Sequence, residues 1–301
     1  MKTILITGGS GLIGSQLTKL LTMKGFQVRW LTRKINPLET TPQFVWDWKN
    51  KSIDTDAFLG VDAIIHLAGA SINGKRWTSQ VKQDIYDSRV VATQFLFESL
   101  AKEKHQVKTI VAGSAVGYYG AVTVDKIFFE DDAAGTDFLA KTCNDWEQTS
   151  EQFSSLGIRT VIIRTGIVLS KESETFKKIA APIRFGMGSG LGSGKQIFPW
   201  IHLADLCGIM LKSLDDESMQ GAYNAVAPES ITNLALMKEL AKAMKKPFFM
   251  PKIPSFIIKL LFGELADALL NGSKISAEKV IKSGYKFQFS NFQEATKSFI
   301  N

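Results

Sequence analysis

Residues 7–14 read Thr-Gly-Gly-Ser-Gly-Leu-Ile-Gly, and this stretch decides the fold. A short run typical of a β-strand, residues 2–7, leads directly into it, and a helical pattern of apolar residues follows over 12–24. A glycine-rich turn between the first strand and the first helix is where α/β proteins bind the pyrophosphate of a dinucleotide. We therefore expect a dinucleotide-binding protein, and a merely tight turn is the alternative.

Each glycine of this turn has its own physical task. The first permits a sharp turn off the strand, the second lets the backbone approach a pyrophosphate, and the third lets the helix pack close to the sheet. The free N–H groups and the positive end of the helix dipole then face the phosphates. The residues expected to bind the cofactor here are Gly8, Ser10, Gly11, Leu12, Ile13 and Gly14.

The end of the second predicted strand indicates which dinucleotide binds. Residues 30–34 read Trp-Leu-Thr-Arg-Lys, and no carboxylate occurs before Glu39. An acidic residue at this place binds the ribose 2′-hydroxyl of NAD, whereas an arginine accommodates the 2′-phosphate of NADP. Arg33 can bind a phosphate through two N–H groups, and Lys34 adds positive charge. We therefore predict NADP(H) as the cofactor; a plain surface Arg–Lys pair is the alternative.

Strands and helices alternate through the first half of the chain. This alternation predicts right-handed βαβ units, and the nearly continuous apolar strands fit a sheet that is covered on both faces. We expect an α/β fold of the Rossmann type, a doubly wound parallel sheet with helices on both faces. The later predicted strands are 26–32, 43–46, 61–67, 107–112 and 158–164, and the long predicted helices are 77–104 and 137–156.

The pattern changes after about residue 170. Five glycines within 186–194 indicate a mobile loop, which could close over a substrate as a lid. Prolines and amphipathic helices follow toward the C-terminus and predict a smaller α/β cap. The expected division is a cofactor-binding domain over 1–170 with part of 200–230, and an interleaved substrate-binding cap over most of 171–301.

Composition and charge exclude several classes of protein. Of the 301 residues, 45% are hydrophobic and 22% charged, which is typical of a globular protein. The net charge of +7 comes from 36 basic and 29 acidic residues that are dispersed along the chain. This dispersal argues against nucleic-acid binding. The most apolar stretch, 256–270, is short and interrupted by charges, so we expect no membrane span.

Two cysteines, Cys143 and Cys207, lie far apart and have no metal-type spacing. We expect neither a metal site nor a disulfide framework, and a reducing compartment, the cytoplasm, as the location. The chain starts directly with a strand, so no signal peptide is expected.

The fourth predicted strand ends in small residues. Leu67, Ala68 and Gly69 leave room for the cofactor's ribose and adenine side, and we expect them to line its site. His66 stands at the end of the same apolar strand, where a structural role is expected rather than a catalytic one.

Motifs along nearly the whole chain resemble the extended short-chain dehydrogenase/reductase group. The resemblance is greater to its atypical epimerase family, of the nucleoside-diphosphate-sugar epimerase type. It implies a Rossmann-type domain, a C-terminal substrate cap and NADP(H) binding, but it does not name a reaction. The matching segments are 7–14, 31–33, 66–69, Ser88-Arg89 with Thr93, 114–120, Trp146-Glu147, 164–169, 200–205, Tyr223-Asn224, 263–266 and 284–287.

The resemblance also implies roles for individual residues. It places Arg89 and Arg164 at the cofactor, and Trp200 and His202 in segments that line the substrate cleft. Relatives often pair through two long helices, so the resemblance makes a homodimer possible but leaves the oligomeric state open.

Members of this superfamily that transfer hydride use a serine after the fifth strand and a YxxxK pair on the next helix. The tyrosine exchanges the proton, and the lysine assists it and holds the nicotinamide ribose. Lys141 is present here, but Asp137 stands four residues earlier, and we interpret the two as a helix-surface ion pair. Ser114, Tyr118 and Tyr119 remain as catalytic candidates, although Ala115 could take the serine's place and the tyrosines could be passive.

Two functional hypotheses follow. The first is an NADP(H)-dependent oxidoreductase or epimerase that acts on a small, oxygenated molecule, with Ser114 and Tyr118 or Tyr119 polarising a ketone. The second is a non-catalytic NADP(H) sensor that binds a protein partner, because the standard tyrosine is missing.

Overall fold

The computed structural model describes residues 2–72 and 76–300. Its main sheet contains β1 (Thr3–Thr7), β2 (Gln27–Thr32), β3 (Gln43–Asp47), β4 (Ser52–Ile53), β5 (Ala63–His66), β6 (Thr109–Ala115), β8 (Arg159–Thr165) and β12 (Gly221–Ala225). Their spatial order is β12-β8-β6-β5-β1-β2-β3-β4, and all neighbours are parallel except β3 and β4. The order reverses between β1 and β5, which is the position where open α/β sheets bind ligands.

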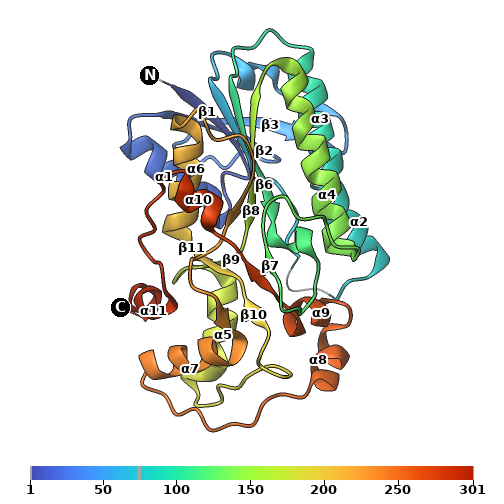
Figure 1. The fold of residues 1–301 in the computed structure, drawn as a ribbon. Coiled ribbons are helices and arrows are strands. Elements are labelled where there is room, and N and C mark those ends of the chain that lie inside the picture. Colours follow the sequence, from blue (N-terminus) through green and yellow to red (C-terminus); the bar gives the residue numbers. More distant parts are fainter. Residues whose placement is uncertain (1, 73–75, 301) are drawn as a thin grey trace.

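Helices cover both faces of this sheet (Figure 1). On one side lie α1 (Leu12–Met23) and α6 (Leu203–Asp215), which pack on each other. On the other side lie α2 (Ser79–Asp87), α3 (Val90–Ala101) and α4 (Phe138–Glu151). The expected doubly wound Rossmann-type fold is therefore confirmed.

The alternation of side chains along β1 explains the two layers. Ile4 and Ile6 belong to the core beneath α1 and α6, whereas Leu5 belongs to the core that contains Phe95 and Leu96 of α3. Successive residues of a strand point to opposite faces, so an apolar run without polar interruptions requires cover on both sides.

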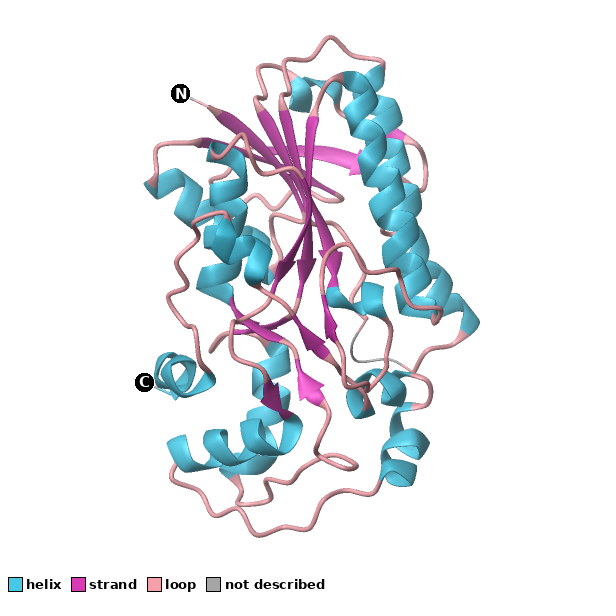
Figure 2. Cartoon of the chain, in the orientation of Figure 1, coloured by secondary structure: helices cyan, strands magenta, loops and turns pink. Residues whose placement is uncertain are grey.

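The cap lies beyond the carboxyl ends of the central strands, toward which the arrowheads point in Figure 2. Its own core includes Phe176, Trp200, Leu236 and Phe292. Its helices are α5 (Glu174–Arg184), α7 (Asn233–Ala243), α8 (Ser255–Phe262), α9 (Leu265–Leu270) and α11 (Phe292–Ile300), while α10 (Glu278–Lys282) contacts β12 of the main sheet. The division at about residue 170 stays a prediction.

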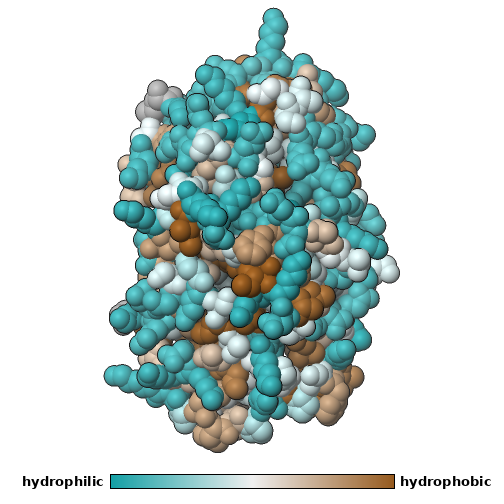
Figure 3. Space-filling view, in the orientation of Figure 1, coloured by the Kyte–Doolittle hydropathy of each residue, from teal (hydrophilic) through white to brown (hydrophobic). Residues whose placement is uncertain are grey.

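Three short strand pairs lie outside the main sheet. They are β9 (Ile167–Leu169) with β11 (Trp200–His202), β10 (Ile197–Phe198) with β13 (Ile231–Thr232), and β7 (Ile127–Phe128) with β14 (Lys274–Ile275). The 3-10 helices are η1 (Thr55–Phe58), η2 (Val116–Tyr119) and η3 (Gln152–Leu156). In Figure 3, apolar atoms gather in the middle of the visible face, where the sheet meets the cap.

The glycine-rich segment 186–194, for which the composition predicts a mobile loop, is hydrogen-bonded to the chain near Ile253. The N–H of Gly192 donates to the Ile253 carbonyl at 2.8 Å, and the Ile253 N–H donates to the Gly190 carbonyl at 2.9 Å. Gly192 has a φ of +56°, and an added Cβ would lie 2.7 Å from the Leu270 side chain. These glycines therefore serve close packing and a left-handed turn, and the paired backbone keeps the segment in place.

The predicted helix over 77–104 is also interrupted. It begins at Ser79, after the Thr78 side chain caps it, and it breaks at Ser88 and Arg89 into α2 and α3. No helix within the described residues has the length and apolar character needed to cross a membrane.

Candidate cofactor and active site

The glycine turn connects β1 to α1 in a closely packed arrangement. Gly8 has a φ of +71°, and its carbonyl accepts the N–H of Gly11 at 3.1 Å. A Cβ on Gly14 would lie 2.3 Å from the Gly8 oxygen, and one on Gly9 would lie 2.4 Å from the Trp30 ring. The first and third glycines of the motif therefore have the tasks that the sequence predicts.

The N-terminus of α1 is left without a cap of its own. Gly11 occupies the N-cap position and supplies no side chain, and the first turn contains no acidic residue. Ser10 and Gly11 are exposed, while Leu12 and Ile13 are half-buried. The first N–H groups of the helix thus lack side-chain acceptors, which suits an anion such as a pyrophosphate.

Arg33 lies one residue beyond β2, beside this turn. The two elements are joined by Trp30, whose ring packs on Gly9 and whose Nε1 donates to the Thr18 hydroxyl at 2.9 Å. Arg33 and Lys34 are exposed, and neither side chain forms an ion pair with a described residue. The Arg33 guanidinium is therefore free to bind a phosphate.

His66 has the structural role that we expect. It is fully buried between the hydroxyls of Thr7 and Thr93, at 2.7 and 2.8 Å from its two ring nitrogens. Burial lowers its pKa to about 4, so the ring is neutral at physiological pH. The Thr7 hydroxyl also accepts the N–H groups of Leu67 and Ala68, each at 3.1 Å. This network fixes the end of β5 against the end of β1 and leaves Gly69 exposed.

Arg89 reaches the carboxyl edge between β5 and β6. A Cβ on Gly69 would lie 3.2 Å from its guanidinium carbon, which is also 5.4 Å from the centre of the Trp146 ring. Its Nη1 donates to the Ile85 carbonyl at 3.1 Å, but no carboxylate among the described residues pairs with it. Burial lowers the pKa of this guanidinium. An unneutralised positive charge therefore faces the predicted cofactor site.

Ser114, whose hydroxyl we expect to polarise a substrate ketone, is buried and hydrogen-bonded within the protein. Its Oγ donates to Oε1 of Glu147 at 2.5 Å, and Glu147 forms an ion pair of 2.8 Å with Arg164. Because a carboxylate takes its only hydrogen, Ser114 has none left to donate to a substrate carbonyl. The structure thus argues against the polarising role that the sequence suggests for Ser114.

Arg164 is committed to the same buried network. Its side chain is only 4% exposed, its Nη1 donates to the Tyr119 hydroxyl at 3.0 Å, and its guanidinium lies 3.5 Å from the centre of the Tyr118 ring. The predicted cofactor contact of Arg164 therefore needs correction, because Glu147 neutralises its charge and the protein occupies its donors.

The two tyrosines lie in different surroundings. Tyr119 is 3% exposed, and its hydroxyl donates to Oδ1 of Asn224 at 2.7 Å. Burial raises its pKa to about 12. Tyr118 is half-buried, and its hydroxyl has no hydrogen-bond partner among residues 2–72 and 76–300. Tyr118 is therefore the tyrosine that can meet a substrate.

Trp200 and His202 do not line a cleft. Trp200 is 1% exposed in the cap core. His202 caps α6, since its Nδ1 accepts the Ala204 N–H at 3.0 Å, and its ring stacks on Phe289 at a centroid distance of 3.8 Å. Burial lowers the pKa of His202 to about 4. Both residues pack elements together, so the prediction that they face the substrate is wrong.

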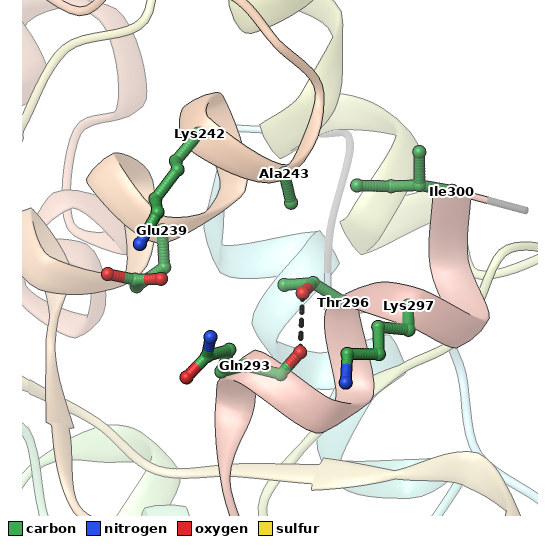
Figure 4. Close-up of a pocket in the computed structure, with 7 residues that line it drawn as sticks. All are labelled: Glu239, Lys242, Ala243, Gln293, Thr296, Lys297 and Ile300. Carbon is green, nitrogen blue, oxygen red and sulfur yellow. Dashed lines mark hydrogen bonds between the residues drawn. The ribbon is translucent and has the colours of Figure 1, made fainter.

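A surface pocket of about 300 Å³ lies elsewhere, between α7 and α11 (Figure 4). None of the predicted site residues belongs to it. Its lining residues are Glu239, Lys242, Ala243, Gln293, Thr296, Lys297 and Ile300.

Comparison with known proteins places the fold and the glycine turn in a family. The model of the NAD dependent epimerase/dehydratase family matches residues 4–225, from β1 to the end of β12. The chain belongs to this epimerase family. A second model, described as a domain of unknown function, matches residues 253–299 in the cap.

Individual members of the epimerase family match nearly the whole chain. YfhF of Bacillus subtilis is 32% identical over 99% of this chain and 97% of its own. SDR39U1 of Bos taurus is 33% identical over 99% of both chains. The crystal structure of human SDR39U1 with NADPH is 29% identical, covers 99% of both chains and superimposes with a TM-score of 0.88.

Ser114 lies against α4, a helix that contains no tyrosine. The residues of α4 beside Ser114 are Cys143 and Glu147. Burial raises the pKa of the Cys143 thiol to about 12, so it stays protonated. Asp137 caps α4 by accepting the Ala140 N–H, so the predicted Asp137–Lys141 ion pair is wrong.

The sequence contains one signal for Glu147, which follows Trp146 in a motif that the resemblance includes. Its partner Arg164 lies 17 positions away, and no local pattern predicts that contact.

Proposed function

We propose that this chain binds NADP(H) on the turn between β1 and α1, and that it is an NADP(H)-dependent oxidoreductase or epimerase of a small, oxygenated molecule. The observation that carries the proposal is the glycine turn with the free Arg33 beside it. The NADPH in the crystal structure of human SDR39U1 supports it.

The residues present fit such a cofactor. The uncapped N-terminus of α1 would hold the pyrophosphate, and Gly14 lets the helix approach because a Cβ there would meet the Gly8 carbonyl. Arg33 would bind the 2′-phosphate, and the edge formed by half-buried Ala68 and exposed Gly69 would accept a ribose. When bound, the nicotinamide supplies a site that accepts or donates a hydride.

Tyr118 is the residue that we assign to proton transfer. Of the three catalytic candidates, Ser114 and Tyr119 use their hydroxyl hydrogens within the protein, whereas the Tyr118 hydroxyl is free. The Arg164 guanidinium lies 3.5 Å from the centre of the Tyr118 ring, and this stacking would hold the ring in place.

A second candidate function is that of an NADP(H)-binding regulator without turnover. The specific observation in its favour is that the residues of α4 beside Ser114, Cys143 and Glu147, include neither a tyrosine nor a lysine. The two functions differ in one measurement, because a regulator binds NADPH but shows no hydride transfer in a broad screen of carbonyl compounds.

The experiment that tests the proposal is a titration with NADPH and NADH, followed by nicotinamide fluorescence. We expect tighter binding of NADPH. The Arg33→Ala variant should bind NADPH about tenfold or more weakly and NADH unchanged, because charged hydrogen bonds to the 2′-phosphate contribute about 1.5–3 kcal/mol.

The matched control is Arg184→Ala, which removes an exposed arginine from the end of α5 in the cap. It should leave both affinities unchanged. Equal affinity of the wild type for NADPH and NADH would show that Arg33 does not select the 2′-phosphate. Binding of neither cofactor would refute the proposal.

A further inference from the structure

Large apolar side chains lie exposed at the end of the cap that is far from the main sheet. The segment that connects α7 to α8 runs around this end of the molecule (Figure 1). The residues with exposed fractions of 64% to 79% in this region, here called the apolar patch, are Phe185, Phe249, Phe256, Leu260 and Leu261. Single exposed apolar residues are ordinary on a protein surface, but a group of large ones indicates a surface that binds a partner.

Contacts between two segments bring the members of the apolar patch together. A Cβ on Gly188 would lie 3.2 Å from the Phe248 ring. The turn after α5, which carries Phe185, therefore packs beside the segment that carries Phe249. The hydrogen bonds between Ile253 and the glycine-rich segment continue this contact to the start of α8. The patch is thus one region of the surface, although its residues come from two parts of the sequence.

Helix α8 supplies three of these side chains. It reads Ser-Phe-Ile-Ile-Lys-Leu-Leu-Phe and is apolar around almost its whole circumference. Ile258 is buried against the protein, whereas Phe256 and Leu260 lie one turn apart on the outward side. A helix on the surface of a globular protein usually keeps its apolar residues on the stripe that faces the core. The outward face of α8 is therefore suited to contact with an apolar medium.

The chain around the apolar patch is strongly basic. Residues 242–262 contain five lysines and no acidic residue, although acidic and basic residues are mixed along the chain as a whole. Lys245 and Lys246 are exposed and form no ion pair with a described residue. Lys259 on α8 pairs with the exposed Asp267 at 3.5 Å. Positive charge beside exposed apolar side chains is complementary to a surface that is both anionic and apolar beneath.

We propose that this end of the cap binds the surface of a membrane that contains anionic lipids. The phenylalanine and leucine side chains enter the boundary between headgroups and acyl chains, and the lysines lie at the level of the anionic headgroups. A nucleic acid offers the same negative charge but no apolar layer for the outward face of α8. Because the protein lies on the membrane, no spanning helix is needed, and the binding does not depend on the proposed cofactor.

The test is sedimentation of the purified protein with lipid vesicles of two compositions. One is phosphatidylcholine alone, and the other contains about one third phosphatidylglycerol, which is anionic. We expect the wild type to bind the anionic vesicles more tightly than the neutral ones, and high salt to weaken this binding. The double variant Phe256→Ser/Leu260→Ser should bind about tenfold or more weakly, because two apolar side chains no longer leave water. Lys245→Gln/Lys246→Gln should weaken binding to the anionic vesicles by about tenfold or more.

The matched control is Met23→Ser/Leu59→Ser, which removes two exposed apolar side chains near the amino ends of the strands, away from the cap. It should bind like the wild type, and thermal unfolding shows that each variant is folded. The proposal is overturned if the wild type does not bind the anionic vesicles, if it binds both compositions equally, or if the control loses as much as Phe256→Ser/Leu260→Ser. A dimer in light scattering that only this double variant loses, without vesicle binding, would show instead that a second copy covers the apolar patch.

Discussion

At the scale of single residues, the buried network around Arg164 distinguishes the three catalytic candidates. Ser114 and Tyr119 use their hydroxyl hydrogens in this network, whereas the hydroxyl of Tyr118 has no partner among the described residues. Ser114 and Tyr119 donate to Glu147 and Asn224, respectively, and Arg164 bonds to both Glu147 and Tyr119. Removing one partner of a buried ion pair leaves an unneutralised charge, which commonly costs about 3–5 kcal/mol. Because Ser114 belongs to β6, Arg164 to β8 and Asn224 to β12, this network holds the ends of the three strands together.

Tyr118 and Tyr119 should consequently respond differently to the loss of a hydroxyl group. Tyr118→Phe should reduce the turnover of a substrate found by screening by about 100-fold or more, with unchanged NADPH affinity, because it removes the proton donor. Tyr119→Phe should keep most of the turnover but lose about 1–3 kcal/mol of unfolding free energy, since Asn224 loses its hydrogen-bond partner.

Steady-state kinetics and denaturant unfolding of the two variants check this prediction. The reverse result, with turnover lost in Tyr119→Phe and retained in Tyr118→Phe, would contradict the assignment of Tyr118.

At the scale of elements, the turn between β1 and α1 contains glycines with separable tasks. A Cβ on Gly14 would lie 2.7 Å from the Gly9 Cα and even closer to the Gly8 carbonyl oxygen. Both are backbone atoms, which cannot move aside as a side chain can. A Cβ on Gly11 would meet only the Gly8 oxygen, at 3.3 Å, and the φ of Gly11 is −76°. Gly14 is thus needed by the fold, whereas the fold nearly leaves room for a side chain at Gly11.

Gly14→Ala should therefore lower the unfolding free energy by about 1–3 kcal/mol and abolish NADPH binding, because α1 must move away from the turn. Gly11→Ala should change stability by less than about 1 kcal/mol yet weaken NADPH strongly, since its methyl group would stand where the backbone approaches the pyrophosphate. Thermal unfolding and nicotinamide fluorescence measure both effects. Normal NADPH binding by Gly14→Ala would show that the turn does not form the site.

At the scale of the whole molecule, two buried histidines link stability to pH. The pKa values of His66 and His202 are lowered by burial to about 4, from 6.5. Between these values the unfolded chain binds more protons than the folded protein, so the unfolding free energy falls as the pH decreases from about 6.5 to 4. We expect a loss of about 1–2 kcal/mol per histidine at pH 5 relative to pH 7.

Urea unfolding at pH 7 and pH 5 measures this loss, with His202→Asn as the comparison. Asparagine can still cap α6 but does not titrate, so the variant should lose less stability on acidification than the wild type. Identical losses would show that His202 contributes nothing to the pH dependence.

The oligomeric state, which the sequence leaves open, also belongs to this scale. The segments through which a homodimer would pair, 77–104 and 137–156, contain α3 and α4, which pack on each other along one side of the molecule (Figure 1). Light scattering of the purified protein would determine the oligomeric state.

The sequence by itself determined the parts of this protein that depend on local spacing. The glycines within 8–14 and the arginine after the second strand lie within a few residues of the elements that they serve. Their chemistry predicted the turn and the cofactor, because strand, turn and helix follow one another directly, and the alternation of strands and helices predicted the doubly wound sheet.

Only the tertiary structure decided which candidate side chains are free. Ser114 is engaged by a residue 33 positions away and Tyr119 by one 105 positions away, and no local pattern predicts such pairs. The same holds for segment 186–194. Its glycines suggest mobility, but only the tertiary structure shows that its backbone is hydrogen-bonded to Ile253. Hydrogen-bond partners in a buried network are set by which strands become neighbours, and that follows from the packing of the whole chain.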